Sequence, residues 1–124
     1  MKKVAKGGAI TINSFLNEGD RTVARNHMLK TASTNMREAA KLCAELGFDG
    51  IDINMGCPDR TIEKQGAGAC MIKTPDVAVK IIQAAKDGAP NLPISVKTRV
   101  GYNKEEIDTW IPILLEQKIA ALTV

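Results

Sequence analysis

The apolar residues of the chain fall at helical spacing in three stretches. Residues 35–46, NMREAAKLCAEL, place them at positions 36, 39, 40, 43 and 46, which form one face of a helix. Asn35 and Glu38 stand in the relation of a capping box, and Gly47 is placed to end the helix. The sequence therefore predicts an amphipathic helix over residues 35–46.

Two further helices are predicted nearer the carboxyl terminus. Residues 75–88, PDVAVKIIQAAKDG, carry an apolar stripe that opens after a Thr-Pro pair and ends at a glycine. Asn103 and Glu106 form a second capping-box start, followed by apolar residues at 107, 110, 111, 114 and 115. Pro112 lies inside this last stretch, so we expect it to kink the helix or end it early.

A short strand is expected after each of these helices. DGIDIN (residues 49–54) and LPISVKTR (92–99) alternate apolar with polar positions, and AALTV (120–124) is interpreted as a third strand. Helix and strand therefore alternate along the chain with short loops between them. This order predicts an α/β fold with parallel strands and crossover helices.

Such a sheet has two possible closures, an open doubly wound sheet or part of a (β/α)8 TIM barrel. A strand buried on both faces would be apolar throughout, whereas Ile51 and Ile53 here oppose Asp52 and Asn54. In a barrel one strand face meets the helices and the other faces the interior, so an apolar face opposed to a polar one fits that geometry. A complete barrel takes about 250 residues, so we expect this chain of 124 residues to form a partial TIM barrel.

Composition narrows the class of protein. With 44% hydrophobic and 25% charged residues, the chain has the makeup of an ordinary globular domain. It has no apolar run as long as the about 20 residues of a membrane span and no pattern typical of a signal peptide, so we expect a cytoplasmic protein. Three unpaired cysteines and one histidine argue against a disulfide framework and against a metal site. The net charge of +3 does not by itself indicate a nucleic-acid partner.

The candidate catalytic and binding residues lie where the predicted strands end. Asn54 and Cys57 follow the first predicted strand, and Lys97 and Arg99 end the second. Because active sites of barrels form at the carboxyl ends of the strands, we expect these residues to converge. Between them, KQGAGACM (residues 64–71) is a run of small residues whose backbone could pass close to a bound ring or phosphate.

These motifs carry a resemblance to a known family. GFDGIDINMGCPDRTIEKQGAGACMIKTP, followed by LPISVKTRVGYN and AALTV, resembles the tRNA-dihydrouridine synthases. The resemblance covers residues 35–124 and rests on the combination of N-x-G-C-P, a GAGA block and V-K-x-R. It implies the central part of a TIM barrel that binds FMN, uses NADPH as reductant and reduces uridine in tRNA.

The resemblance also implies roles for four residues. Cys57 matches the family's catalytic cysteine, a thiol able to protonate C5 of uracil. Asn54 matches a residue that hydrogen-bonds the uracil, and Lys97 matches a lysine that contacts FMN where reduction builds negative charge. Arg99 matches a position of the same motif and is assigned to a substrate or cofactor phosphate.

Other parts of the chain depart from the family pattern. Residues 1–34 match none of the family's motifs, and we set them apart as an unrelated or poorly ordered amino-terminal segment. The alternatives are another FMN barrel, of the dihydroorotate or dihydropyrimidine dehydrogenase type, and an inactive truncated product that binds RNA or protein. Flavin binding and binding to bulk tRNA distinguish these three hypotheses.

Overall fold

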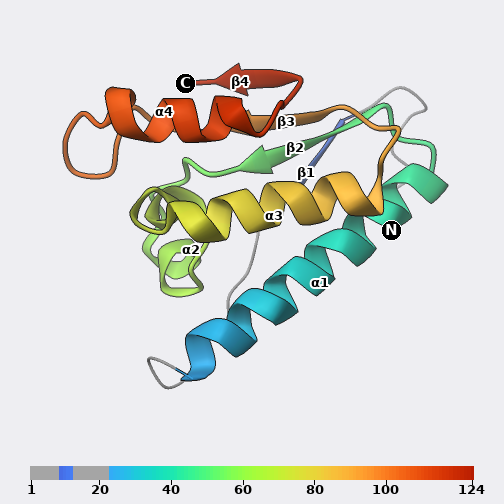
Figure 1. Ribbon diagram of the computed structural model, residues 1–124, viewed down its shortest axis with the longest axis horizontal. Helices are drawn as coiled ribbons and strands as arrows, with labels where there is room; N and C mark the ends of the chain where they lie inside the picture. The colour runs from blue at the N-terminus through green and yellow to red at the C-terminus, as the bar shows by residue number, and fades with distance from the viewer. Residues whose placement is uncertain (1–8, 13–22) are drawn as a thin grey trace.

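The computed structural model describes residues 9–12 and 23–124, with side chains from residue 32 onward. Strands and helices alternate through most of this part of the chain (Figure 1). The elements in chain order are β1 (Ala9–Ile12), α1 (Val23–Glu45), β2 (Gly50–Asn54), α2 (Arg60–Lys64), the 3-10 helix η1 (Gly68–Lys73), α3 (Pro75–Gly88), β3 (Ile94–Lys97), α4 (Ile107–Glu116) and β4 (Ala121–Thr123).

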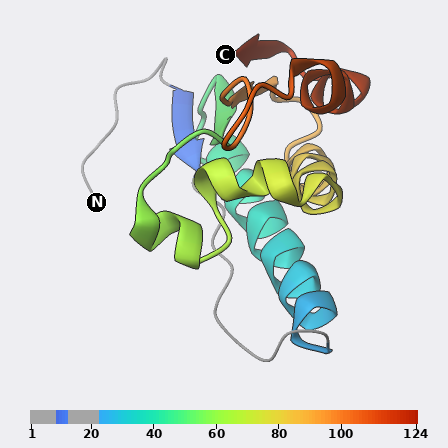
Figure 2. The ribbon, with the colours of Figure 1, turned by 90° about the vertical axis from the view of Figure 1, so that its left-hand side faces the viewer.

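The four described strands form one parallel sheet in the order β1-β2-β3-β4. A doubly wound sheet reverses its strand order at a switch point, whereas here each crossover moves one strand further in the same direction. Right-handed crossovers that all move in one direction put their helices on the same face. In both views α1, α3 and α4 lie on one side of the sheet, as such crossovers require (Figures 1 and 2). The predicted α/β fold is confirmed, and its arrangement is that of part of a TIM barrel.

The core lies between this sheet and the helices. Ile51 and Ile53 of β2 and Val96 of β3 are at most 1% exposed and belong to one cluster with apolar residues of α1, α3 and α4. The other face of the sheet is polar, and there the Ser95 hydroxyl bonds Asp52 at 2.7 Å. The alternation in the sequence therefore separates a helix-covered face from the face that lines a barrel interior.

Helix α1 is longer than the pattern predicts. It begins at Val23, so Asn35 is an exposed residue inside the helix and does not cap it. The reason is that buried Ala32 lies one turn before buried Met36, so the stripe that packs on α3 continues toward the amino terminus. The predicted end is confirmed: Gly47 adopts φ 79° and donates its N–H to the Ala44 carbonyl at 3.1 Å.

Helix α4 begins later than the pattern predicts. Its first residue is Ile107 and its N-cap is Glu106, so the predicted cap Asn103 lies in the loop before the helix. The Glu106 carboxylate accepts a hydrogen bond from the Tyr102 N–H at 2.8 Å in this loop. Pro112 lies inside the helix, which continues to Glu116, so of the two expected effects the early end does not occur and the kink stays a prediction.

The amino-terminal segment, residues 1–34, contributes strand β1 and the first turns of helix α1. Residues 9–12, which lie in this segment without matching motifs, form β1 and pair with β2 in parallel. Residues 1–8 and 13–22 lie outside the described residues, and with them most of that segment.

Candidate active site

The predicted site residues lie together at the carboxyl edge of the sheet. Asn54 is the last residue of β2 and Lys97 the last of β3, and the two are direct neighbours in the register. Cys57 and Arg99 follow in the next loops. The side-chain stem of Arg99 passes close to Gly56, since a Cβ placed on that glycine would lie 3.3 Å from Arg99 Cγ. The expected convergence of these residues is therefore present in the fold.

The Asn54 side chain shapes the turn that carries Cys57. Its Oδ1 accepts hydrogen bonds from the N–H groups of Gly56 at 3.0 Å and Cys57 at 3.1 Å. An asparagine that bonds the backbone two and three residues ahead folds the chain into an Asx turn. Asn54 therefore holds the backbone of the cysteine in place through its oxygen, and its Nδ2 is a further hydrogen-bond donor.

The small-residue block packs on the other side of the same turn. Ala69 donates its N–H to the Cys57 carbonyl at 2.8 Å. Gly68 adopts φ 68°, and a Cβ at this position would overlap the Cys57 carbonyl oxygen. Among the described residues, the neighbour that this block approaches is therefore the cysteine loop. The small side chains allow two backbones to touch.

A third contact reaches the turn from β3 and α4, and the sequence patterns did not reveal it. The Thr98 hydroxyl donates to the Met55 carbonyl at 3.2 Å and accepts from Trp110 Nε1 at 2.9 Å. Trp110 was predicted only as part of an apolar stripe. The sequence held one indication of this contact: the indole N–H of a buried tryptophan needs a hydrogen-bond acceptor.

Cationic side chains are exposed around this edge. The exposed cations between β2 and α3, at the end of β3, and between β3 and α4 are Arg60, Lys64, Lys73, Lys97, Arg99 and Lys104. Two carboxylates among them are engaged within the protein: Glu63 accepts from the Tyr102 hydroxyl at 3.1 Å and Glu106 from the Tyr102 N–H. Lys73 lies 3.6 Å from the centroid of the Tyr102 ring. The same segments also carry the exposed carboxylates of Asp59 and Glu105, so this surface bears charges of both signs with cations in excess.

The other two cysteines are Cys43 in helix α1 and Cys70 in the 3-10 helix η1. Cys43 is buried in the core as predicted, and burial raises its pKa. Cys70 donates its thiol proton to the Ala67 carbonyl at 3.1 Å. Burial raises the pKa of Cys70, and the charge of Glu63 raises it further. A thiol with a raised pKa is a weak nucleophile at neutral pH.

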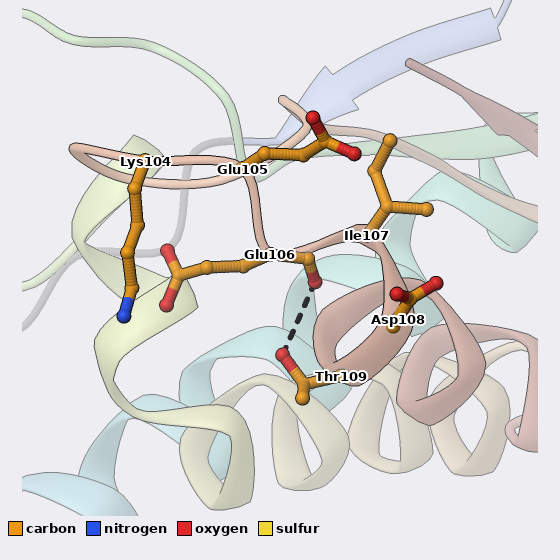
Figure 3. Close-up of a pocket in the computed structure, with 6 residues that line it drawn as sticks. All are labelled: Lys104, Glu105, Glu106, Ile107, Asp108 and Thr109. Carbon is orange, nitrogen blue, oxygen red and sulfur yellow. Dashed lines mark hydrogen bonds between the residues drawn. The ribbon is translucent and has the colours of Figure 1, made fainter.

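A hollow of about 470 Å³ lies before α4, lined by residues 104–109 (Figure 3). Three of its six residues are carboxylates, which disfavour a phosphate-bearing ligand, and none is a predicted site residue. Among the described residues, no cluster of three or more histidine, cysteine or acidic side chains is arranged to hold a metal ion. No described helix combines the length and apolar character needed to cross a membrane.

Comparisons with known proteins agree with one another. A family model described as dihydrouridine synthase (Dus) matches residues 10–124. A "Probable tRNA-dihydrouridine synthase" of Staphylococcus aureus is 44% identical over 99 residues, as is "Probable tRNA-dihydrouridine synthase 2" of Bacillus subtilis. Each alignment covers 79% of this chain and 30% of the relative, so the chain spans about a third of those proteins. The family match begins within β1, earlier than the motifs indicate.

Proposed function

Because this chain belongs to the dihydrouridine synthase family, we propose that it carries a central part of the active site of an FMN-dependent tRNA-dihydrouridine synthase. The reaction is reduction of the C5=C6 bond of uracil in tRNA, with NADPH as the reductant. The observation that carries the proposal is Cys57 at the carboxyl edge of a parallel sheet, with its N–H bonded to Asn54 and its carbonyl bonded to the Ala69 N–H. Barrel enzymes bind their substrates at this edge.

The donor set at this edge fits one part of a flavin. Lys97 is exposed on the polar face of the sheet, beside Asn54 in the register. An ammonium group there matches the flavin edge that becomes negative on reduction, and would hold FMN by a charge-assisted hydrogen bond. Bound FMN supplies the hydride that reduction of uracil requires.

Cys57 supplies the proton. Addition of hydride to C6 breaks the C5=C6 π bond and leaves an electron pair at C5, which takes a proton from Cys57 Sγ. The resulting thiolate regains its proton from solvent, so the reaction is balanced by one hydride and one proton. General acid catalysis of this kind requires a donor held within hydrogen-bond reach of its acceptor. The turn made by Asn54 supports such a placement, because it fixes the backbone of the cysteine.

Asn54 and Arg99 contact the substrate in this proposal. Since Oδ1 of Asn54 accepts two backbone N–H groups, its remaining role is to donate from Nδ2 to a uracil carbonyl. Arg99 is exposed beside the cysteine turn and contacts a phosphate. The surrounding lysines and arginines add sequence-independent attraction for the tRNA backbone.

The test uses the purified chain, FMN, NADPH and unmodified tRNA. We expect a bound-flavin absorbance spectrum and formation of dihydrouridine, measured by mass spectrometry of the digested tRNA. Cys57→Ala should keep flavin binding and lose the product, whereas the matched variant Cys70→Ala should keep both. Full product formation by Cys57→Ala would refute the assigned role. Reduction of free uracil in place of tRNA would instead favour the other class of flavin barrel.

A further inference from the structure

The peptide group between Met55 and Gly56 is held at both of its polar atoms. Its carbonyl oxygen accepts from the Thr98 hydroxyl at 3.2 Å, and its N–H donates to Asn54 Oδ1 at 3.0 Å. The N–H of Cys57 also donates to Asn54 Oδ1, at 3.1 Å. Because glycine gives position 56 unusual rotational freedom, these bonds determine how the two peptide planes before Cys57 are oriented.

We propose that Thr98, itself oriented by Trp110, is a positioning residue for Cys57. Met55 is fully buried and its own N–H bonds the Lys97 carbonyl at 2.7 Å. The loop is therefore anchored to β3 immediately before it reaches Thr98. Release of the Met55 carbonyl would leave this peptide held only through its N–H to Asn54, which would loosen the turn that carries the cysteine.

A hydroxyl is required at position 98 because it donates and accepts at once. Thr98 gives its proton to Met55 and takes the indole N–H of Trp110 at 2.9 Å. Valine has the same shape and can do neither, whereas serine can do both. Thr98 is 4% exposed and is the one buried polar residue in the part of the chain whose side chains are described. Burial of a polar group costs free energy unless its hydrogen-bond partners are present.

Trp110 links helix α4 to the cysteine turn. The indole is 2% exposed and belongs to the core cluster that joins α4 to α3 and the sheet. The backbone of Thr98 also touches the turn directly, since a Cβ on Gly56 would lie 3.1 Å from the Thr98 carbonyl carbon. Helix α4 therefore orients the Thr98 hydroxyl through Trp110, and that hydroxyl holds the loop that carries Cys57.

This inference rests on the proposed role of Cys57, and its test needs neither flavin nor tRNA. Amide hydrogen exchange is measured in the 124-residue chain with Thr98, with Thr98→Val and with Thr98→Ser. Alkylation of each cysteine is followed by mass spectrometry in the same samples. Loss of one hydrogen bond changes a local opening equilibrium by about fivefold. We expect Thr98→Val to raise exchange of the Gly56 and Cys57 amides, and alkylation of Cys57, by about this factor.

Two internal references separate local positioning from general loss of stability. Cys43 is buried in the core, so its alkylation reports global opening, as does amide exchange in β3. Thr98→Ser is expected to behave as the parent chain. If Thr98→Val does not fold, Trp110→Phe replaces it, and we expect a smaller increase confined to the same two amides. Equal increases at Cys43 and Cys57, or no change at the Gly56 amide, would overturn the proposal.

Discussion

Replacement of Gly68 by alanine tests the contact that closes the small-residue block over the cysteine turn. Gly68 adopts φ 68°, a conformation that costs an alanine about 1–2 kcal/mol. The added methyl would also overlap the Cys57 carbonyl oxygen and lie 3.1 Å from Ile62 Cγ2. Relieving that overlap requires the two backbones to separate, which costs about 1–3 kcal/mol by the usual effect of overpacking. We therefore expect Gly68→Ala to lower the free energy of unfolding by about 2–5 kcal/mol.

Gly47→Ala is the matched control. Gly47 also has a positive φ, 79°, but a Cβ there would meet no atom within 4 Å. It should therefore cost only the conformational term, about 1–2 kcal/mol. Both variants are measured by urea denaturation, with fluorescence of the single tryptophan, buried Trp110, as the probe. Equal losses in the two variants would refute the reasoning, because the overlap with Cys57 would then contribute nothing.

Two further predictions concern charge. Lys97→Met should weaken FMN binding by about tenfold or more, because it removes a hydrogen bond to a charged group. The control Lys80→Met, at an exposed position of α3, should not weaken it. Flavin fluorescence titration measures both affinities, and equal affinities would contradict the role of Lys97. Burial raises the pKa values of Cys43 and Cys70 above the ordinary 9.0, so the folded chain keeps protons that the unfolded chain loses. Stability should therefore be complete below that pH and decline as the pH rises through the folded-state values. Urea midpoints across alkaline pH check this, and a steeper decline in the Cys43→Ala, Cys70→Ala double variant than in the parent would contradict it.

Most of the described elements could be predicted from periodicity. The strand pattern around Ile51 and Ile53 and the helix 75–88 match β2 and α3, because each carries a complete signal of spacing and end residues. The start of α1 could not be predicted, since Asn35 has the residue type of a cap but lies inside a stripe that packs on α3. Strand β1 lies in a segment without any of the quoted motifs, and its identity as a strand depends on pairing with β2.

The candidate site was predictable in part for the same reason. Cys57, Asn54 and Lys97 lie at strand ends within short motifs, so their place at the carboxyl edge follows from chain order. Their roles in catalysis and binding stay predictions. The Thr98 and Trp110 contact could not be predicted, because a pattern of apolar spacing assigns Trp110 to the core and says nothing of where its N–H points.

The sequence by itself determined the alternation of strands and helices, the polar and apolar faces of the sheet, and the place of Cys57 after a strand. These features depend on neighbours a few residues apart, whose geometry the backbone sets locally. Only the tertiary structure decided that Gly68 lies against the Cys57 carbonyl and that Thr98 holds Met55. Those contacts join residues far apart in the chain, and a hydrogen bond or a steric overlap exists only once packing has brought both partners together.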